Sequence, residues 1–166
     1  MTEPDQKPSR SGRMRRVLKR GVLALAALLI LAQFFPVAYT NPPVTSEIVL
    51  PADVEPILRR SCYDCHSNET VWPWYSRVAP VSWLVAKDVA EGREYLNYSE
   101  WGRYDAERLA ELMEETVEEI EEDEMPMPAY TWLHPDARLS DTDKRILTEW
   151  AVANGGTATD ENDEDH

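Results

Sequence analysis

The stretch Cys62-Tyr63-Asp64-Cys65-His66 contains both cysteines of this 166-residue chain, and a histidine directly follows the second cysteine. Cys-x-x-Cys-His is the attachment pattern of a c-type haem, in which both thiols form thioethers with the haem vinyl groups. The adjacent histidine then binds the iron as its proximal ligand. The pattern therefore predicts one covalent haem c, held by Cys62, Cys65 and His66.

Three other interpretations of the cysteines explain less of the pattern. A redox dithiol expects a thioredoxin-like βαβ context, which residues 50–80 do not suggest. A structural zinc site takes four ligands, and the chain offers only His134 and His166 as further histidines. A disulfide between Cys62 and Cys65 would leave the histidine unexplained.

A basic segment and an apolar run precede the motif. Residues 1–20 carry a cluster of arginines and lysines, and residues 21–39 read GVLALAALLILAQFFPVAY without a charge. This run has the length of a transmembrane helix. Because the positive charge precedes it, the positive-inside rule places residues 1–20 in the cytoplasm and the rest of the chain outside.

The expected location is thus the cytoplasmic membrane, with a single pass and a C-terminal domain on the periplasmic or extracellular side. This is the side on which c-type haem is attached. Residues 36–40 match a signal-peptide cleavage site poorly, which favours a retained signal anchor over a cleaved signal.

The charge distribution narrows the possible partners. The formal net charge is -14 at pH 7, and residues 1–20 hold 7 of the 17 Lys and Arg residues but only 2 of the 31 Asp and Glu residues, so the remainder is more acidic than the whole. Such a domain repels nucleic acid and anionic lipid surfaces. The predicted partners are the membrane, through the N-terminal helix, and a redox protein whose surface can be basic.

The exported region predicts helices and no strands. Residues 40–51 have the composition of an extended linker, 52–156 form the haem-binding domain, and 157–166 form a disordered acidic tail. Helices are expected over 53–60, 80–96 and 105–122, and a final helix begins at Ser140, where Asp143 completes a capping box. Ser99 is expected to cap the segment that follows it. The predicted fold is all-α: a small cytochrome c-like domain behind one transmembrane helix.

The helix over 105–122 carries an unusual charge pattern. Its apolar residues, Met113 among them, recur at helical spacing and predict a core-facing side. The run from Glu111 to Glu124 is otherwise almost wholly acidic. It is either a solvated face or a docking patch for a basic redox partner.

The second axial ligand of the iron has three candidates. Met125 and Met127 lie in a proline-rich loop between two predicted helices, and prolines can hold a thioether in a fixed position. His134 is the third candidate, although it can instead cap the last helix or bind a haem propionate. The alternative for the methionines is packing against the haem edge.

Aromatic residues are concentrated after the haem motif. Trp72, Trp74, Tyr75 and Trp83 are predicted to wall the haem, because a macrocycle needs apolar cover and an indole N–H can reach a propionate. An ordinary aromatic core is the alternative.

Several spaced motifs resemble the bacterial haem-binding domain family, a group of exported single-haem CxxCH proteins. The motifs that carry the resemblance are SCYDCHSN at 61–68, WPWY at 72–75, APVSW at 79–83, EMP at 124–126 and LHPDARLS at 133–140. The resemblance covers about residues 41–154 and implies haem binding through Cys62, Cys65 and His66. It also favours Met125 over Met127. The order of helices is similar to that of class I cytochromes c.

The expected function is one-electron transfer outside the cytoplasmic membrane by a membrane-anchored monohaem c-type cytochrome. No second haem motif, nucleotide fingerprint or catalytic triad is visible, so a carrier or accessory module is favoured over an enzyme. The alternative is a haem-based sensor or a peroxidase-like enzyme with an exchangeable axial site. A non-haem redox or metal-binding protein is the third possibility.

Overall fold

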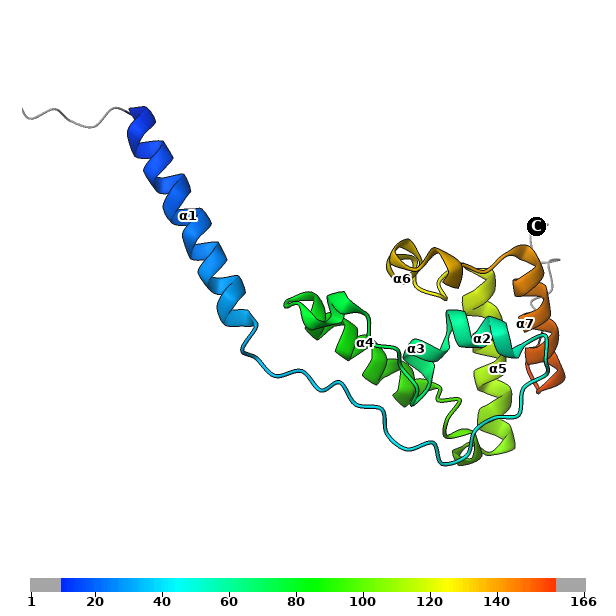
Figure 1. Ribbon diagram of the computed structural model, residues 1–166. Helices are drawn as coiled ribbons and strands as arrows, with labels where there is room; N and C mark the ends of the chain where they lie inside the picture. Colours follow the sequence, from blue (N-terminus) through cyan, green and yellow to red (C-terminus); the bar gives the residue numbers. More distant parts are fainter. Residues whose placement is uncertain (1–9, 158–166) are drawn as a thin grey trace, which may run out of the picture. The chain divides into compact units, whose positions relative to one another are not determined.

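The computed structural model describes residues 10–157 (Figure 1). Within this range the chain is helical and contains no strand, only an isolated bridge between Ser46 and Glu100, so the all-α prediction is confirmed. Part of the basic segment and nearly all of the predicted acidic tail, together with His166, lie outside the described residues. The helices are α1 (Arg10–Ala32), α2 (Glu55–Ser61), α3 (Tyr63–His66), α4 (Val81–Tyr95), α5 (Ala106–Glu121), α6 (Pro128–Leu133) and α7 (Asp141–Ala153), with 3₁₀ turns η1 (Trp74–Arg77), η2 (Trp101–Arg103) and η3 (Pro135–Ala137).

The chain divides into two compact units. The first consists of Pro73–Ala86 and the described part of Met1–Ala38, and the second consists of Tyr39–Trp72 and the described part of Lys87–His166. Helix α4 begins in the first unit and ends in the second. The haem motif and the two loop methionines belong to the second unit.

Helix α1 differs from the helix predicted over 21–39. It begins within the basic segment and ends at Ala32. The next residue, Gln33, donates a hydrogen bond to the Ala79 carbonyl (3.2 Å) and accepts one from the Ala79 amide (3.1 Å), and Pro36 cannot donate in a helix. Within residues 10–157, no helix combines the length and apolar composition that crossing a membrane requires. The predicted transmembrane helix is therefore not found in this form.

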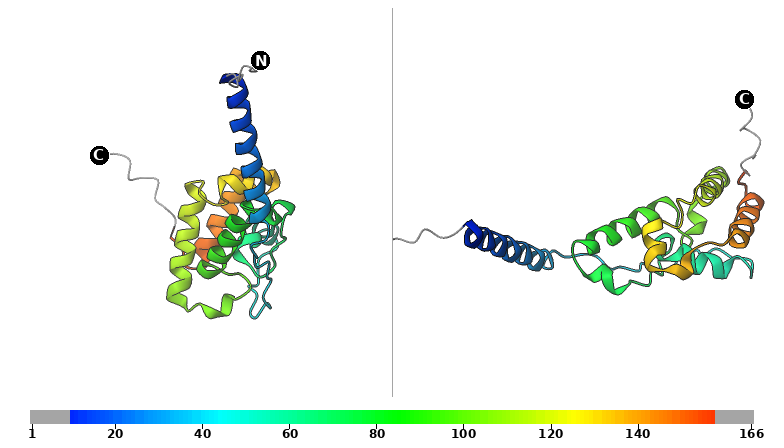
Figure 2. Two further views of the ribbon diagram at one scale, coloured as in Figure 1. Left: turned by 90° about the vertical axis from the view of Figure 1, so that its left-hand side faces the viewer. Right: turned by 90° about the horizontal axis from the view of Figure 1, so that it is seen from above.

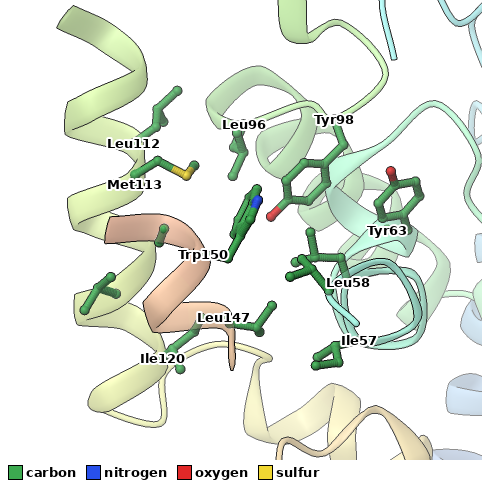
Figure 3. Close-up of a cluster of buried hydrophobic side chains, with 13 residues drawn as sticks. Ile57, Leu58, Tyr63, Leu96, Tyr98, Leu112, Met113, Ile120, Leu147 and Trp150 are labelled. Carbon is green, nitrogen blue, oxygen red and sulfur yellow. The ribbon is translucent and has the colours of Figure 1, made fainter. Parts of the chain in front are cut away.

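The core of the second unit lies between α2, α5 and α7. Helices α5 and α7 pack side by side (Figures 1 and 2). Figure 3 shows Trp150 of α7 at the centre, with Leu112 and Met113 of α5 on one side and Leu58 and Tyr98 on the other. Met113 is fully buried, as its position on the apolar face of the predicted helix indicates.

Two helix starts show how local sequence determines the element boundaries. The Ser140 hydroxyl accepts from the Asp143 amide and the Asp143 carboxylate accepts from the Ser140 amide, so the predicted capping box of α7 is confirmed. Helix α5 is capped by Asp105, whose side chain accepts from the Arg108 amide. The cap predicted at Ser99 is wrong, because its hydroxyl instead accepts from the buried Asn68 amide at 2.9 Å.

The extended segment before α2 is hydrogen-bonded to the loop after α4. The Ile48 amide donates to the Tyr98 carbonyl, the Thr45 and Ser46 amides donate to the Ser99 carbonyl, and the Trp101 amide donates to the Ser46 carbonyl. These bonds satisfy backbone groups that would otherwise need water. Residues 45–48 thus form part of the packed domain.

Candidate functional site

The haem motif occupies a single helical turn that follows α2 directly. The Cys62 amide donates to the Leu58 carbonyl at 2.8 Å, and the Cys62 carbonyl accepts from the amides of Cys65 (3.1 Å) and His66 (2.9 Å). The three residues predicted to hold the haem therefore come from one turn, and both thiols are free. Between them, Tyr63 is buried and its ring stacks on Tyr98 at 5.3 Å, which fixes the turn to the core.

The two thiols are in surroundings that disfavour the thiolate. Burial raises the pKa of Cys62 to about 12, and the neighbouring Cys65 adds to the shift. Burial likewise raises the pKa of Cys65 to about 11, with a further contribution from Asp64. A redox dithiol works through a lowered thiol pKa, so these surroundings do not suit that interpretation.

The His66 ring is oriented by a backbone carbonyl. Its Nδ1 lies 3.1 Å from the Leu96 oxygen. Since a carbonyl can only accept, Nδ1 carries the proton and Nε2 presents its lone pair. Burial lowers the pKa of His66, while hydrogen bonds to the Leu96 and Gly92 backbone oppose the shift, so the neutral ring is favoured. A neutral imidazole with an oriented Nε2 is what a haem iron requires of its proximal ligand.

Helix α4 approaches the motif at Gly92. A Cβ atom built at this glycine would lie 2.8 Å from the Cys65 carbonyl oxygen, closer than real Cβ contacts. A glycine inside a helix costs stability relative to alanine, and it is used where a backbone must come close. Gly92 therefore allows α4 to pack directly on the attachment turn.

Replacing Gly92 with alanine is expected to lower the free energy of unfolding by about 1–3 kcal/mol, because the added methyl must displace α4 or the Cys65 backbone. The same displacement should reduce the yield of attached haem. Thermal unfolding and haem staining measure the two effects. Gly21→Ala is the matched control, since a Cβ there meets nothing within 4 Å. Equal stability of the two variants would show that α4 does not pack tightly on the Cys65 backbone.

Asp64 connects the attachment turn to two other segments. Its Oδ1 accepts from the Val71 amide at 2.9 Å, and its Oδ2 accepts from the Tyr130 hydroxyl at 2.8 Å. Its backbone carbonyl accepts from the Thr70 hydroxyl at 2.7 Å. Val71 directly precedes Trp72. Tyr130 follows the loop that holds Met125 and Met127, called the methionine loop below.

The candidates for the second axial position lie around the start and end of α6. Met125 is 36% exposed and its amide donates to the Glu119 carbonyl. Met127 is the N-cap of α6, and its carbonyl accepts from the Tyr130 and Thr131 amides. His134 ends the helix, with its ring stacked on Tyr130 at 4.4 Å. The choice between the three stays a prediction.

The predicted haem-wall residues divide between the units. Trp72, in the second unit, meets Tyr39 edge to face, and within the described residues its buried Nε1 has no hydrogen-bond partner. An orphaned buried donor suits an acceptor such as a propionate. Trp74 and Trp83 belong to the first unit, where their rings contact Tyr75 and Phe35. Trp74 is 78% exposed.

Sequence reasoning missed Arg93, the cation that organises the loops beside the motif. Its guanidinium donates to the carbonyls of Ser67 (2.7 Å) and Thr40 (2.8 Å) and to the side chains of Asn41 (2.9 Å) and Thr70 (2.7 Å). An arginine that binds acceptors in distant segments leaves no local pattern in the sequence. Gly92, the interior helix glycine next to it, was the one feature that could have drawn attention to this position.

A buried amide network lies behind the motif and was also missed. The Asn68 Oδ1 accepts from the Asn97 side chain at 2.9 Å, and the Asn97 Oδ1 accepts from the Ser99 amide. The Tyr98 amide donates to the His66 carbonyl at 2.8 Å. The network holds Leu96, and with it the acceptor for His66, in place.

Comparison with known proteins identifies the family. The profile of the haem-binding domain family matches residues 27–153, which is most of the chain and includes the whole attachment turn. The chain therefore belongs to this family, and the resemblance found in the sequence is confirmed. Neither the curated proteins nor the solved structures gave a match.

Proposed function

We propose that this member of the haem-binding domain family is a monohaem c-type cytochrome that passes single electrons outside the cytoplasmic membrane. The observation that carries the proposal is the orientation of His66, whose Nδ1 bonds the Leu96 carbonyl beside two free thiols on the same turn. A haem bound here supplies one-electron chemistry at its iron.

The chain's own residues have distinct roles in this proposal. Cys62 and Cys65 would anchor the group covalently, and the neutral His66 ring would present Nε2 to the iron. Trp72, whose Nε1 has no hydrogen-bond partner among residues 10–157, would offer that donor to a propionate. The close packing of α4 at Gly92 and the buried network around Asn68 hold the attachment turn in place.

Met125 is the proposed distal ligand. It lies four residues after the end of α5, and the hydrogen bond from its amide to the Glu119 carbonyl ties the loop to the last turn of that helix. A methionine sulfur bound to the iron would favour electron transfer over the sensor or peroxidase-like alternative.

Carbon monoxide binding tests this function. We expect the reduced wild-type protein to bind carbon monoxide slowly, and to be oxidised and reduced reversibly by one electron, because a methionine occupies the distal position. Rapid carbon monoxide binding by the unmodified protein would contradict the carrier function and favour the sensor or enzyme alternative.

We further propose that residues 1–39 direct export of the haem domain and remain as its anchor in the cytoplasmic membrane. The haem domain then lies on the periplasmic or extracellular side. The support is the basic segment followed by the uncharged run 21–39. Fractionation of cells and sequencing of the mature N-terminus test this. A released protein beginning near residue 40 would show a cleaved signal, and a cytoplasmic holoprotein would contradict the proposed location.

The proposed redox partner is a protein with a basic surface that docks on the acidic run of Glu111–Glu124. Most of this run is exposed on α5 and the turn that follows it, and the run ends next to Met125. Burial and the neighbouring carboxylates of Glu124 and Glu122 raise the pKa of Glu119, as expected where like charges are crowded. A basic partner would relieve this repulsion.

Charge reversal is expected to slow association with such a partner. With Glu118→Lys and Glu122→Lys together, the association rate should fall and lose much of its dependence on ionic strength, because exposed charges steer encounter over about 8 Å at physiological salt. Stopped-flow electron transfer to a basic cytochrome measures the rate. Asp53→Lys with Glu149→Lys is the matched control outside the run. Equal rates in both double variants would leave only the solvated-face interpretation.

A further inference from the structure

The methionine loop is connected to the attachment turn by one hydrogen bond between side chains. The Tyr130 hydroxyl donates to Asp64 Oδ2 at 2.8 Å, across 66 residues of sequence. Asp64 stands between the two cysteines, and Tyr130 is in the helix that the methionine loop enters. We propose that this hydrogen bond positions the methionine loop and so determines how firmly the distal methionine stays bound.

Helix α6 is short and mostly exposed to solvent. It is six residues long, its N-cap makes no side-chain hydrogen bond, and Thr131 is its buried residue. Trp132 is 78% exposed and Leu133 is half exposed. The helix packs against η3, which follows it directly in the chain. A helix this short is not stable alone, so its position depends on its tertiary contacts.

Backbone hydrogen bonds extend the restraint on Tyr130 to the loop that holds Met125 and Met127. The Tyr130 and Thr131 amides donate to the Met127 carbonyl at 2.9 and 3.1 Å. Holding the Tyr130 side chain therefore fixes the first turn of α6, and with it the residues between α5 and α6. The stack of Tyr130 on His134 restrains the tyrosine ring at the same time.

Asp64 is held as a rigid acceptor. Its other oxygen accepts from the Val71 amide, and its carbonyl accepts from the Thr70 hydroxyl. Because both carboxylate oxygens are engaged, the group cannot rotate away without losing a bond. Hydrogen bonds to a charged acceptor are the stronger kind.

The inference rests on the proposed function, since it concerns a distal methionine on a haem held at Cys62, Cys65 and His66. Tyr130 is a positioning residue that acts through the loop. Without the Tyr130 hydroxyl, the loop would open more often, and an external ligand would reach the iron of a bound haem sooner.

The test uses the full-length ferric holoprotein and imidazole as the external ligand. We expect imidazole to bind about tenfold faster to Tyr130→Phe than to wild type, with unchanged covalent haem content. The methionine-to-iron absorption band should weaken in the variant. In an Asp64→Ala background, the Tyr130 substitution should have no further effect, because the acceptor is already gone.

Val117→Ala is the control for general loss of stability. Val117 is fully buried in α5, and its truncation destabilises the domain without touching the bond. If Val117→Ala binds imidazole as fast as Tyr130→Phe does, the positioning role of Tyr130 is overturned. The same holds if binding is unchanged in Tyr130→Phe while wild type shows the methionine band. A wild-type protein without that band would overturn the distal assignment in the proposed function as well.

Discussion

Replacing both Cys62 and Cys65 with alanine is expected to abolish covalent haem in protein produced with c-type maturation. These are the only cysteines in the chain, so no other thiol can form the thioethers. The measurement is haem staining after denaturing electrophoresis, which removes any haem that is not covalently bound. The expected change is complete loss of the stained band.

Two further variants separate attachment from ligation. Met113→Leu changes a buried core methionine and should keep full staining. His66→Ala should keep thioether attachment but lose the proximal ligand, which changes the spin state of the iron. Full staining with both cysteines replaced would rule out the haem c interpretation.

Replacing Met125 with alanine is expected to remove the methionine-to-iron absorption band of the oxidised protein and to open the distal position to carbon monoxide. A thioether ligand raises the haem potential, so the potential should fall as well. Absorption spectroscopy measures the band and the binding of carbon monoxide by the reduced protein, and a redox titration measures the potential. Met127→Ala is the matched control from the same loop, and it should keep the band.

Other outcomes of this comparison would reassign the ligand. Loss of the band in Met127→Ala alone would move the distal ligand by two residues and leave the function unchanged. A spectrum of the histidine type that disappears in His134→Ala would indicate two axial histidines and a lower potential.

The sequence predicted the elements whose signals are local. The apolar period of α5 placed Met113 in the core, and the Ser140–Asp143 pair located the start of α7. Several spaced motifs, from the attachment motif at 61–68 to the stretch at 133–140, identified the family that the profile match confirms. For the two helices, neighbouring residues in the sequence carry the physical cause.

The sequence could not predict contacts between distant segments. Nothing near Gln33 shows that its side chain bonds the Ala79 backbone, so the end of α1 was predicted too late. Ser99 looked like a helix cap. Its actual partner, Asn68, lies in another segment, so the local sequence could not show the competing hydrogen bond. The bond of Tyr130 to Asp64 has the same character: both residues are ordinary in their local context, and only the fold brings them together.

The intact mass of the denatured, purified protein tests the central claim most directly. The account predicts one species, whose mass is that of the mature polypeptide plus one haem, in protein made with c-type maturation. The mass should return to that of the polypeptide alone when both cysteines are replaced. An unmodified mass for the wild-type chain, from cells that attach haem to a control cytochrome c, would contradict the account.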